Sequence, residues 1–191
     1  MRLGLKGGQL KILSKDQVYE VDFKKQIAKI PEYLFEESLR KTPKSFRCCG
    51  RDPKEDFIVE GRRVYFGTCA GATNIIDPET GERRSGRLSD MGNVAKVCDA
   101  LPNIDFVMGI TTALDISEKI RPLYEPYIVM SNTCKHVQAF CYHDGEIIKN
   151  LIKIAELIVG GSDELRKRPI ISLYNEPVSP LVFGKEYVDA L

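Results

Sequence analysis

From residue 88 onward, the chain alternates between helical and strand-like patterns of hydrophobic positions. Apolar residues at the spacing of one helix face predict helices over 88–101 and 146–159, and a weaker helix, interrupted by Pro122 and Pro126, over 116–130. Short and mostly apolar runs predict buried strands at 104–110, 136–141 and 169–174. This order indicates βα units on a parallel sheet.

The part of the chain before residue 88 has a different pattern of hydrophobic and polar positions. Pro31, followed by acidic residues, predicts a helix start near residue 31. Residues 57–59 and 63–66 flank Glu60-Gly61 and predict a β-hairpin, and a second hairpin is predicted over 74–82, with Gly81 at the left-handed turn position. We therefore expect an N-terminal helical or irregular segment over 1–55, a β-hairpin region over 56–87 and a βα portion over 88–191.

The predicted fold class is α/β, with a parallel sheet of about three strands. A sheet of this size exposes long edges and uncovered apolar faces, and a closed TIM-type barrel needs many more strands. The pattern therefore predicts an incomplete α/β structure, or one that another copy of the chain completes.

Composition narrows the functional classes. The chain has 191 residues with 28 Lys and Arg against 27 Asp and Glu, a net charge of +1, which argues against a nucleic-acid clamp. We find no apolar run long enough to span a membrane and no secretory signal at the N-terminus, so we expect a cytoplasmic protein with no membrane partner. The six cysteines are expected to be thiols.

A cluster of thiols and imidazoles lies at Cys134, His136, Cys141 and His143. Zinc takes such ligands when they converge, but alternation along a strand directs the first pair and the second pair to opposite faces. Core thiols and strand-end histidines are the simpler interpretation, and we expect no metal. A metal protein stays open as a third hypothesis, resting on this cluster alone.

Functional residues of α/β sheets and barrels gather at the carboxyl ends of the strands. This rule selects Glu176 as the candidate catalytic charge, with capping of the next helix as its alternative role. The candidate substrate-binding residues follow the three strands: Thr111, Thr112, Tyr142, His143, Tyr174 and Asn175. The two tyrosines offer aromatic faces to a cation, although such residues also pack in cores.

Several linked motifs extend over the chain from about residue 30 to its end. They are GRDP (50–53), RVYFGT (63–68), DPETGERR (77–84), DALPNIDFV (99–107), RP (168–169) and YNEPVSPL (174–181), with GGQL (7–10) near the start. Together they resemble the trimethylamine methyltransferase family.

The resemblance implies a TIM-type barrel enzyme that moves a methyl group from a methylated amine to the cob(I)alamin of a cognate corrinoid protein. The substrate would be trimethylamine or a quaternary amine such as glycine betaine. The corrinoid would belong to the partner, so we expect no directly bound cofactor. Aromatic faces and a carboxylate would hold such a cation, which gives Tyr142, Tyr174 and Glu176 their roles.

The resemblance also implies that this sequence covers only part of the family's barrel. We therefore expect a partial TIM-type barrel, preceded by a small hairpin-rich region, that is poorly active alone because an incomplete barrel does not preorganise a site. The alternative is a non-catalytic half-barrel that binds a partner or self-associates as a homo-oligomer through its unpaired strands.

Overall fold

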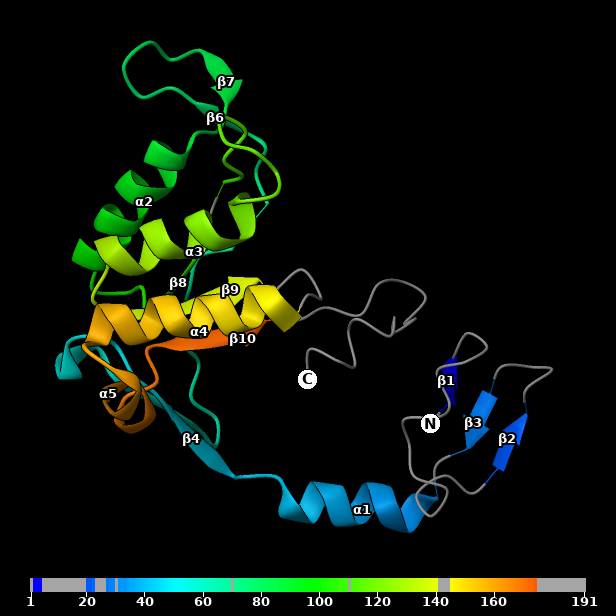
Figure 1. Ribbon diagram of the computed structural model, residues 1–191. Coiled ribbons are helices and arrows are strands. Elements are labelled where there is room, and N and C mark those ends of the chain that lie inside the picture. Colours follow the sequence, from blue (N-terminus) through cyan, green and yellow to red (C-terminus); the bar gives the residue numbers. More distant parts are fainter. Residues whose placement is uncertain are drawn as a thin grey trace. The chain divides into compact units, whose positions relative to one another are not determined.

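The computed structural model describes residues 2–4, 20–22, 27–29, 31–69, 71–109, 111–140 and 145–174. The chain divides into two compact units, one formed mainly by residues 1–44 and the other by residues 45–142 and 146–174. In the first unit, three short strands form an antiparallel sheet in the order β1-β3-β2 (Figure 1); they are β1 (Arg2–Gly4), β2 (Glu20–Asp22) and β3 (Ile27–Lys29). The helix α1 (Glu32–Lys41) follows Pro31, as predicted.

The centre of the second unit is a parallel three-stranded sheet in the order β10-β9-β8. Its strands are β8 (Phe106–Met108), β9 (His136–Phe140) and β10 (Ile171–Tyr174). The register pairs Val107 of β8 and Ile171 of β10 with Val137 of β9. The predicted βα alternation and the three predicted strands are therefore confirmed.

Helices pack on one face of this sheet (Figure 1). They are α2 (Leu88–Ala100), α3 (Arg121–Asn132) and α4 (Gly145–Val159), and the short α5 (Ser162–Lys167) follows them. Val107 and Val137 of the sheet join one buried cluster with Met91 of α2, Val129 of α3 and Ala155 of α4. Since side chains alternate along a strand, the residues next to these valines face away from the helices.

A segment upstream of α2 extends the sheet beyond β8. Gly67 and Ala72 form isolated parallel bridges with Phe106 and Thr111. The Thr68 hydroxyl donates to the Met108 carbonyl at 2.5 Å and accepts from the Met108 N–H at 2.8 Å. The described residues 66–69, 71 and 72 therefore run beside β8 in the position of a further parallel strand.

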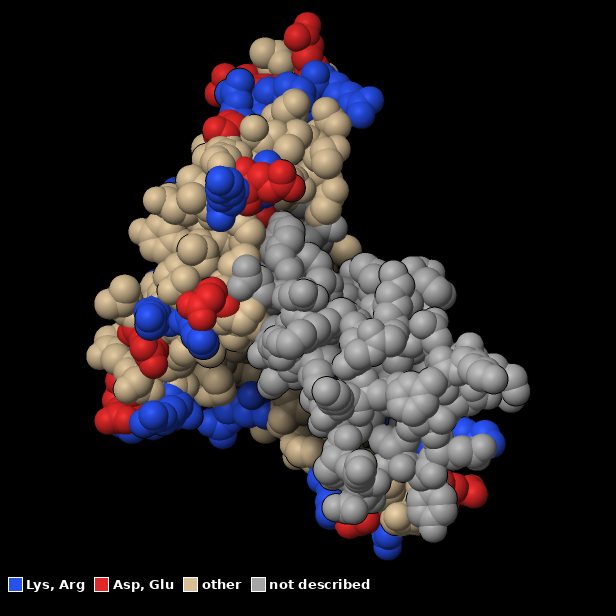
Figure 2. Space-filling model, turned by 45° about the vertical axis from the view of Figure 1, so that its right-hand side comes forward, with Lys and Arg blue, Asp and Glu red and all other residues tan. Residues whose placement is uncertain are grey.

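Two antiparallel hairpins complete the second unit. The first pairs β4 (Ser45–Cys48) with β5 (Phe57–Glu60), and a 3₁₀ turn (Pro53–Glu55) lies between them. The second pairs β6 (Asn74–Ile76) with β7 (Arg83–Ser85), as predicted, and Gly81 has a φ of +74° in its turn. On the face shown in Figure 2, side chains of both charge signs gather over the β6–β7 hairpin, in keeping with the near-neutral net charge.

Charge pairs fix the second hairpin to α2. The Arg84 guanidinium donates to both oxygens of Asp90, at 2.7 and 2.8 Å, and to Asp77 at 2.5 Å. The bond from Arg84, with two backbone N–H groups of the turn, lowers the pKa of Asp77 to about 2. Asp90 also accepts from the N–H of Arg87 at 2.8 Å and so caps the start of α2.

Two local expectations were wrong or incomplete. Residues 63–66 do not pair with β5, because β5 pairs with β4 and the chain from Phe66 onward runs beside β8. Helix α5 begins directly after Gly160 and Gly161, which have φ values of +94° and +139°, and it was not predicted.

Candidate functional site

The carboxyl ends of β8, β9 and β10 meet at one edge of the sheet, because the strands are parallel. Tyr174 is the last residue of β10 and the register partner of Phe140, the last residue of β9. Thr111 and Thr112 follow β8 at the same edge. The structure thus brings Thr111, Thr112 and the backbone of Tyr174 to one edge, whereas Tyr142, His143, Asn175 and Glu176 lie outside the described residues.

Thr111 and Thr112 join the β8 exit to the neighbouring segment. Thr111 is buried and its hydroxyl donates to the Ala72 carbonyl at 2.7 Å, while the Thr112 N–H donates to the same carbonyl at 2.8 Å. A Cβ on Gly86 would overlap the Thr111 hydroxyl and approach the Thr112 carbonyl to 2.7 Å. The Thr111 hydroxyl is therefore engaged by the Ala72 carbonyl. Thr111 and Thr112 form part of the backbone at the carboxyl edge of the sheet.

Two side chains of α3 hold the loop that follows Thr112. The Ala113 N–H donates to the Glu125 carboxylate at 2.7 Å, and Arg121 Nε donates to the Ala113 carbonyl at 3.0 Å. Burial raises the pKa of Glu125, against the opposing effects of the Ala113 N–H and of Arg121. Both backbone groups of the buried Ala113 are thus satisfied from one helix, which fixes the β8–α3 loop at the carboxyl edge.

The face of the sheet opposite the helices is closed at its amino end by aromatic rings. Phe57 contacts the edge of the His136 ring, with centroids 6.0 Å apart, and lies 6.3 Å from Phe106 and 4.6 Å from Tyr65. His136 is buried, and its Nδ1 lies 3.0 Å from the Cys49 carbonyl. This aromatic cluster covers the first row of the face, at the amino ends of β8 and β9.

The second row of that face contains Met108, Gln138 and Ser172. The register makes Met108 and Ser172 the two neighbours of Gln138, and all three residues are half-buried. Sequence reasoning missed Gln138 and Ser172, although a signal existed. In strands buried on both faces, polar side chains interrupt an apolar run, and these two interrupt β9 and β10 at the same level.

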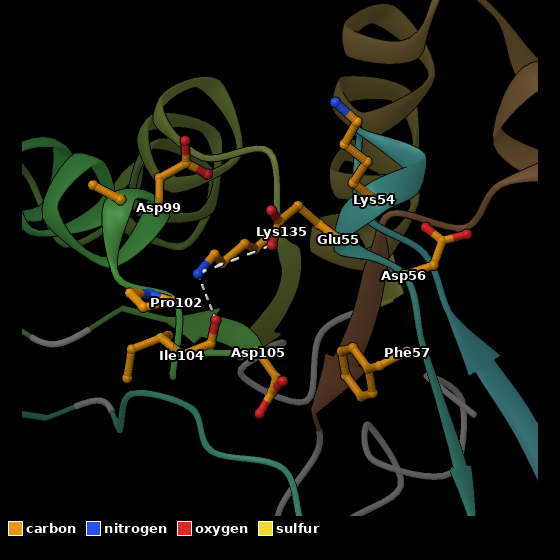
Figure 3. A pocket seen from close by; sticks show the side chains of 10 residues that line it. Lys54, Glu55, Asp56, Phe57, Asp99, Pro102, Ile104, Asp105 and Lys135 are labelled. Carbon is orange, nitrogen blue, oxygen red and sulfur yellow. Dashed lines mark hydrogen bonds and ion pairs between the residues drawn. The ribbon is translucent and has the colours of Figure 1, made fainter.

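A polar pocket of about 430 Å³ lies at the other end of the sheet (Figure 3). Its lining includes Glu55, Asp99, Asp105 and Lys135, which surround the amino ends of β8 and β9. The Lys135 ammonium is buried and donates to the carbonyls of Leu101 and Ile104, at 2.5 Å each. In open parallel α/β sheets ligands bind at the carboxyl ends of the strands, so we assign this pocket at the amino ends a structural role.

The motif GRDP closes the same amino end. The Arg51 N–H donates to the Cys134 carbonyl at 2.7 Å, and Arg51 Nε donates to the Thr133 carbonyl at 2.9 Å. Arg168, from the RP motif, donates to both oxygens of Asp56, at 2.6 and 3.1 Å, and to the Gly50 carbonyl at 2.8 Å. The GRDP and RP motifs, far apart in the sequence, thus meet at the amino end of the sheet. Their hydrogen bonds connect the β4–β5 hairpin to the segments that precede β9 and β10.

The thiol and imidazole cluster is described only in part. In the described ranges, no three His, Cys, Asp or Glu side chains gather as a metal site, and Cys141 lies outside them with His143. Burial lowers the pKa of His136, against the opposing effect of its bond with the Cys49 carbonyl. Burial also raises the pKa of the Cys48 and Cys49 thiols. This environment favours neutral groups packed in the interior.

None of the helices in the described part of the chain is both long and apolar enough to cross a membrane.

Comparison with known proteins finds relatives that are methyltransferases. The chain is 35% identical over 161 residues to a trimethylamine methyltransferase of Desulfitobacterium hafniense (strain DSM 10664 / DCB-2), covering 84% of this chain and 32% of the relative. It is 33% identical to a trimethylamine methyltransferase of Methanosarcina barkeri (strain Fusaro / DSM 804), covering 87% of this chain and 34% of the relative. A glycine betaine methyltransferase of Desulfitobacterium hafniense (strain Y51) is 26% identical, with 82% of this chain and 32% of the relative covered.

The chain therefore spans about a third of the length of these curated relatives. The family model described as trimethylamine methyltransferase (MTTB) matches residues 15–191, which include the whole parallel sheet. On this match and these relatives, the chain belongs to the trimethylamine methyltransferase family.

Proposed function

We propose that the protein transfers a methyl group from a methylated amine to the cob(I)alamin of a corrinoid partner protein. The observation that carries the proposal is family membership over residues 15–191, a range that includes the sheet with its carboxyl edge. Trimethylamine and glycine betaine are the donors named for the relatives, and both are methylated nitrogen compounds.

The chemistry is a nucleophilic displacement at a methyl carbon. The electron pair of Co(I) forms the new bond to carbon, the C–N bond breaks, and its electron pair stays on the nitrogen of the product amine. A desolvated alkylammonium that is aligned in line with the nucleophile is an acceptable donor. The protein must therefore bind the amine, exclude water and leave one methyl group exposed to the partner.

The proposed site lies at the carboxyl edge of β8, β9 and β10. Thr111, Thr112 and the loop held by Glu125 form its rim, and the row of Met108, Gln138 and Ser172 forms its floor. The residues predicted after β9 and β10 complete this proposal: Tyr142, His143, Tyr174, Asn175 and Glu176. In it, Glu176 supplies the charge that neutralises an ammonium ion, and the aromatic rings contact its methyl groups.

We further propose that the sheet is part of a TIM-type barrel that additional strands complete. In the described ranges β10 pairs on one side only, with β9, and such an edge is a template for further pairing. Activity is therefore expected from an assembly that closes the sheet, which is either an oligomer of this chain or the chain with the complementary part of a relative.

The test is a spectroscopic assay of methyl transfer. The purified chain is separated by size, and each fraction is mixed with a corrinoid protein in its cob(I) state and with trimethylamine or glycine betaine. A parallel sample contains the part of the Desulfitobacterium hafniense trimethylamine methyltransferase that this chain does not match. We expect amine-dependent formation of methylcob(III)alamin in the oligomer or in the complemented sample. A lack of conversion in every sample would contradict the proposal.

A non-catalytic role is the second candidate, and the same one-sided pairing of β10 favours it. In that case the chain would bind a partner barrel or a second copy without turnover. A stable assembly that lacks activity in all samples would identify this role. Robust turnover by a monomer of this chain would contradict both the need for assembly and this second candidate.

A further inference from the structure

We propose that Gln138 and Ser172 form hydrogen bonds to the polar end of the methylated amine and determine which amines bind. The inference rests on the proposed function and adds to it the residues that select the substrate. Sequence reasoning placed the site in the loops after the strands, whereas these two residues lie within the sheet.

The position of the pair supports a role toward a ligand. Ser172 is the direct register partner of Gln138 on the adjacent strand, so their side chains leave the sheet side by side on one face. That face is opposite to the one covered by α2, α3 and α4, because the alternate residue Val137 belongs to the helix-side core. Toward the amino end, the ring of Phe57 against His136 closes the face. A small molecule that contacts the pair would therefore approach from the carboxyl edge.

The hydrogen-bonding state of the pair supports the same role. Among the described residues, the side chains of Gln138 and Ser172 form no hydrogen bond with one another or with a neighbour, and both residues are half-buried. Other polar side chains nearby are committed, as the Thr111 hydroxyl is to the Ala72 carbonyl. A half-buried amide or hydroxyl without a protein partner keeps its donors and acceptors available to a ligand.

The chemistry of the pair sets the substrate class. An amide and a hydroxyl both donate and accept hydrogen bonds but carry no charge. They can bind the N–H of trimethylammonium or a carboxylate oxygen of glycine betaine. They offer no hydrogen bond to tetramethylammonium, which has neither a donor nor an acceptor. The pair therefore favours methylated amines that carry a hydrogen-bonding group over those that carry methyl groups alone.

The experiment compares three ligands and two variants by isothermal titration. It uses the preparation that is active in the methyl-transfer assay, so a failure of the proposed function is detected first and separately. Gln138→Met keeps the length of the side chain and removes its hydrogen bonds, and Ser172→Ala removes one hydroxyl. Asn150→Leu is the matched control, because it replaces a half-buried amide on α4, which packs on the other face of the sheet. Thermal unfolding confirms that each variant is folded.

We expect Gln138→Met to weaken the binding of trimethylammonium or glycine betaine by about tenfold, and Ser172→Ala to weaken it by a smaller factor. The ligand that is weakened identifies whether the N–H or the oxygen is the recognised group. Tetramethylammonium binding should stay unchanged in both variants, and Asn150→Leu should change nothing. Equal weakening for all three ligands, or none for any, would overturn the inference and leave methyl transfer standing.

Discussion

The close approach of Gly50 to Cys134 gives the sharpest stability prediction. A Cβ at Gly50 would overlap the Cys134 carbonyl oxygen and would lie 2.8 Å from the Cβ of Glu55 and 3.1 Å from the carbonyl of Asp52. These are backbone atoms or atoms fixed close to the backbone, so no side-chain rotation relieves the overlap. Gly50→Ala must therefore move the GRDP segment away from the start of β9.

The cost of that movement follows from the bonds that the segment makes. Displacement weakens the bond from the Arg51 N–H to the Cys134 carbonyl, at 2.7 Å, and the bond from Arg168 to the Gly50 carbonyl, at 2.8 Å. It also affects the bond from the Gly50 N–H to Asp56, at 3.1 Å. At about 1 kcal/mol for each bond, with overpacking of similar size, we expect Gly50→Ala to lower the free energy of unfolding by about 2–4 kcal/mol.

Urea unfolding, followed by circular dichroism, measures this loss, and Gly92→Ala provides the matched control. A Cβ at Gly92 meets the flexible side chain of Ile128 at 3.2 Å, and the new alanine favours the helix by about 1 kcal/mol. Gly92→Ala should therefore be neutral or stabilising. A Gly50→Ala protein within about 0.5 kcal/mol of the wild type would refute the view that this close contact closes the amino end of the sheet.

Three further predictions concern single side chains around the sheet. Burial lowers the pKa of His136 below the ordinary histidine value of 6.5, so near and below that pH the unfolded chain binds more protons than the folded chain. The free energy of unfolding should therefore fall as the pH is lowered from about 7.5 to about 5.5. The slope from this group is at most about 1.4 kcal/mol per pH unit. His136→Asn retains a donor for the Cys49 carbonyl and should flatten the urea-midpoint profile; an unchanged slope would assign the loss elsewhere. Burial raises the pKa of Glu125, so the charged carboxylate costs stability at pH 7 and Glu125→Gln should stabilise the protein there. The gain in the free energy of unfolding should shrink toward pH 4.5, where the carboxyl group takes up a proton. A gain that grows on acidification would contradict this prediction. Thr111→Val removes the donor to the Ala72 carbonyl and should cost about 1–2 kcal/mol in the same urea assay, whereas Thr112→Val, which keeps its backbone bond, should cost less.

The periodic part of the sequence predicted the helices and parallel strands of the second unit well. The apolar stripe of α4 and the short runs at β8, β9 and β10 were correct because burial on a parallel sheet imposes those patterns directly. The hairpin expected over 57–66 was wrong because the pattern of a strand does not determine which other strand it pairs with. Residues 57–60 pair with β4, which their own pattern does not specify.

For the candidate site, the sequence predicted only which residues follow the strand ends. The rule for carboxyl ends selected Thr111 and Thr112, which do lie at the sheet edge, but it could not reveal that the Thr111 hydroxyl is bonded to Ala72, a residue far away in the sequence. Gln138 and Ser172 become neighbours only through the register of β9 with β10. Arg168 of the RP motif bonds both to Asp56 and to Gly50 of the GRDP motif, and this tertiary contact is likewise not encoded in local patterns.

The most direct test of the central claim follows the methyl group itself. Trimethylamine labelled with ¹³C in its methyl groups is incubated with the assembled protein and a corrinoid protein in its cob(I) state, and NMR detects the label. Methyl transfer predicts a cobalt-bound ¹³C-methyl signal that grows as the N-methyl signal declines, one equivalent for each cobalt. Label that stays entirely on nitrogen, beside a corrinoid that a known methyltransferase can still methylate, would contradict the account.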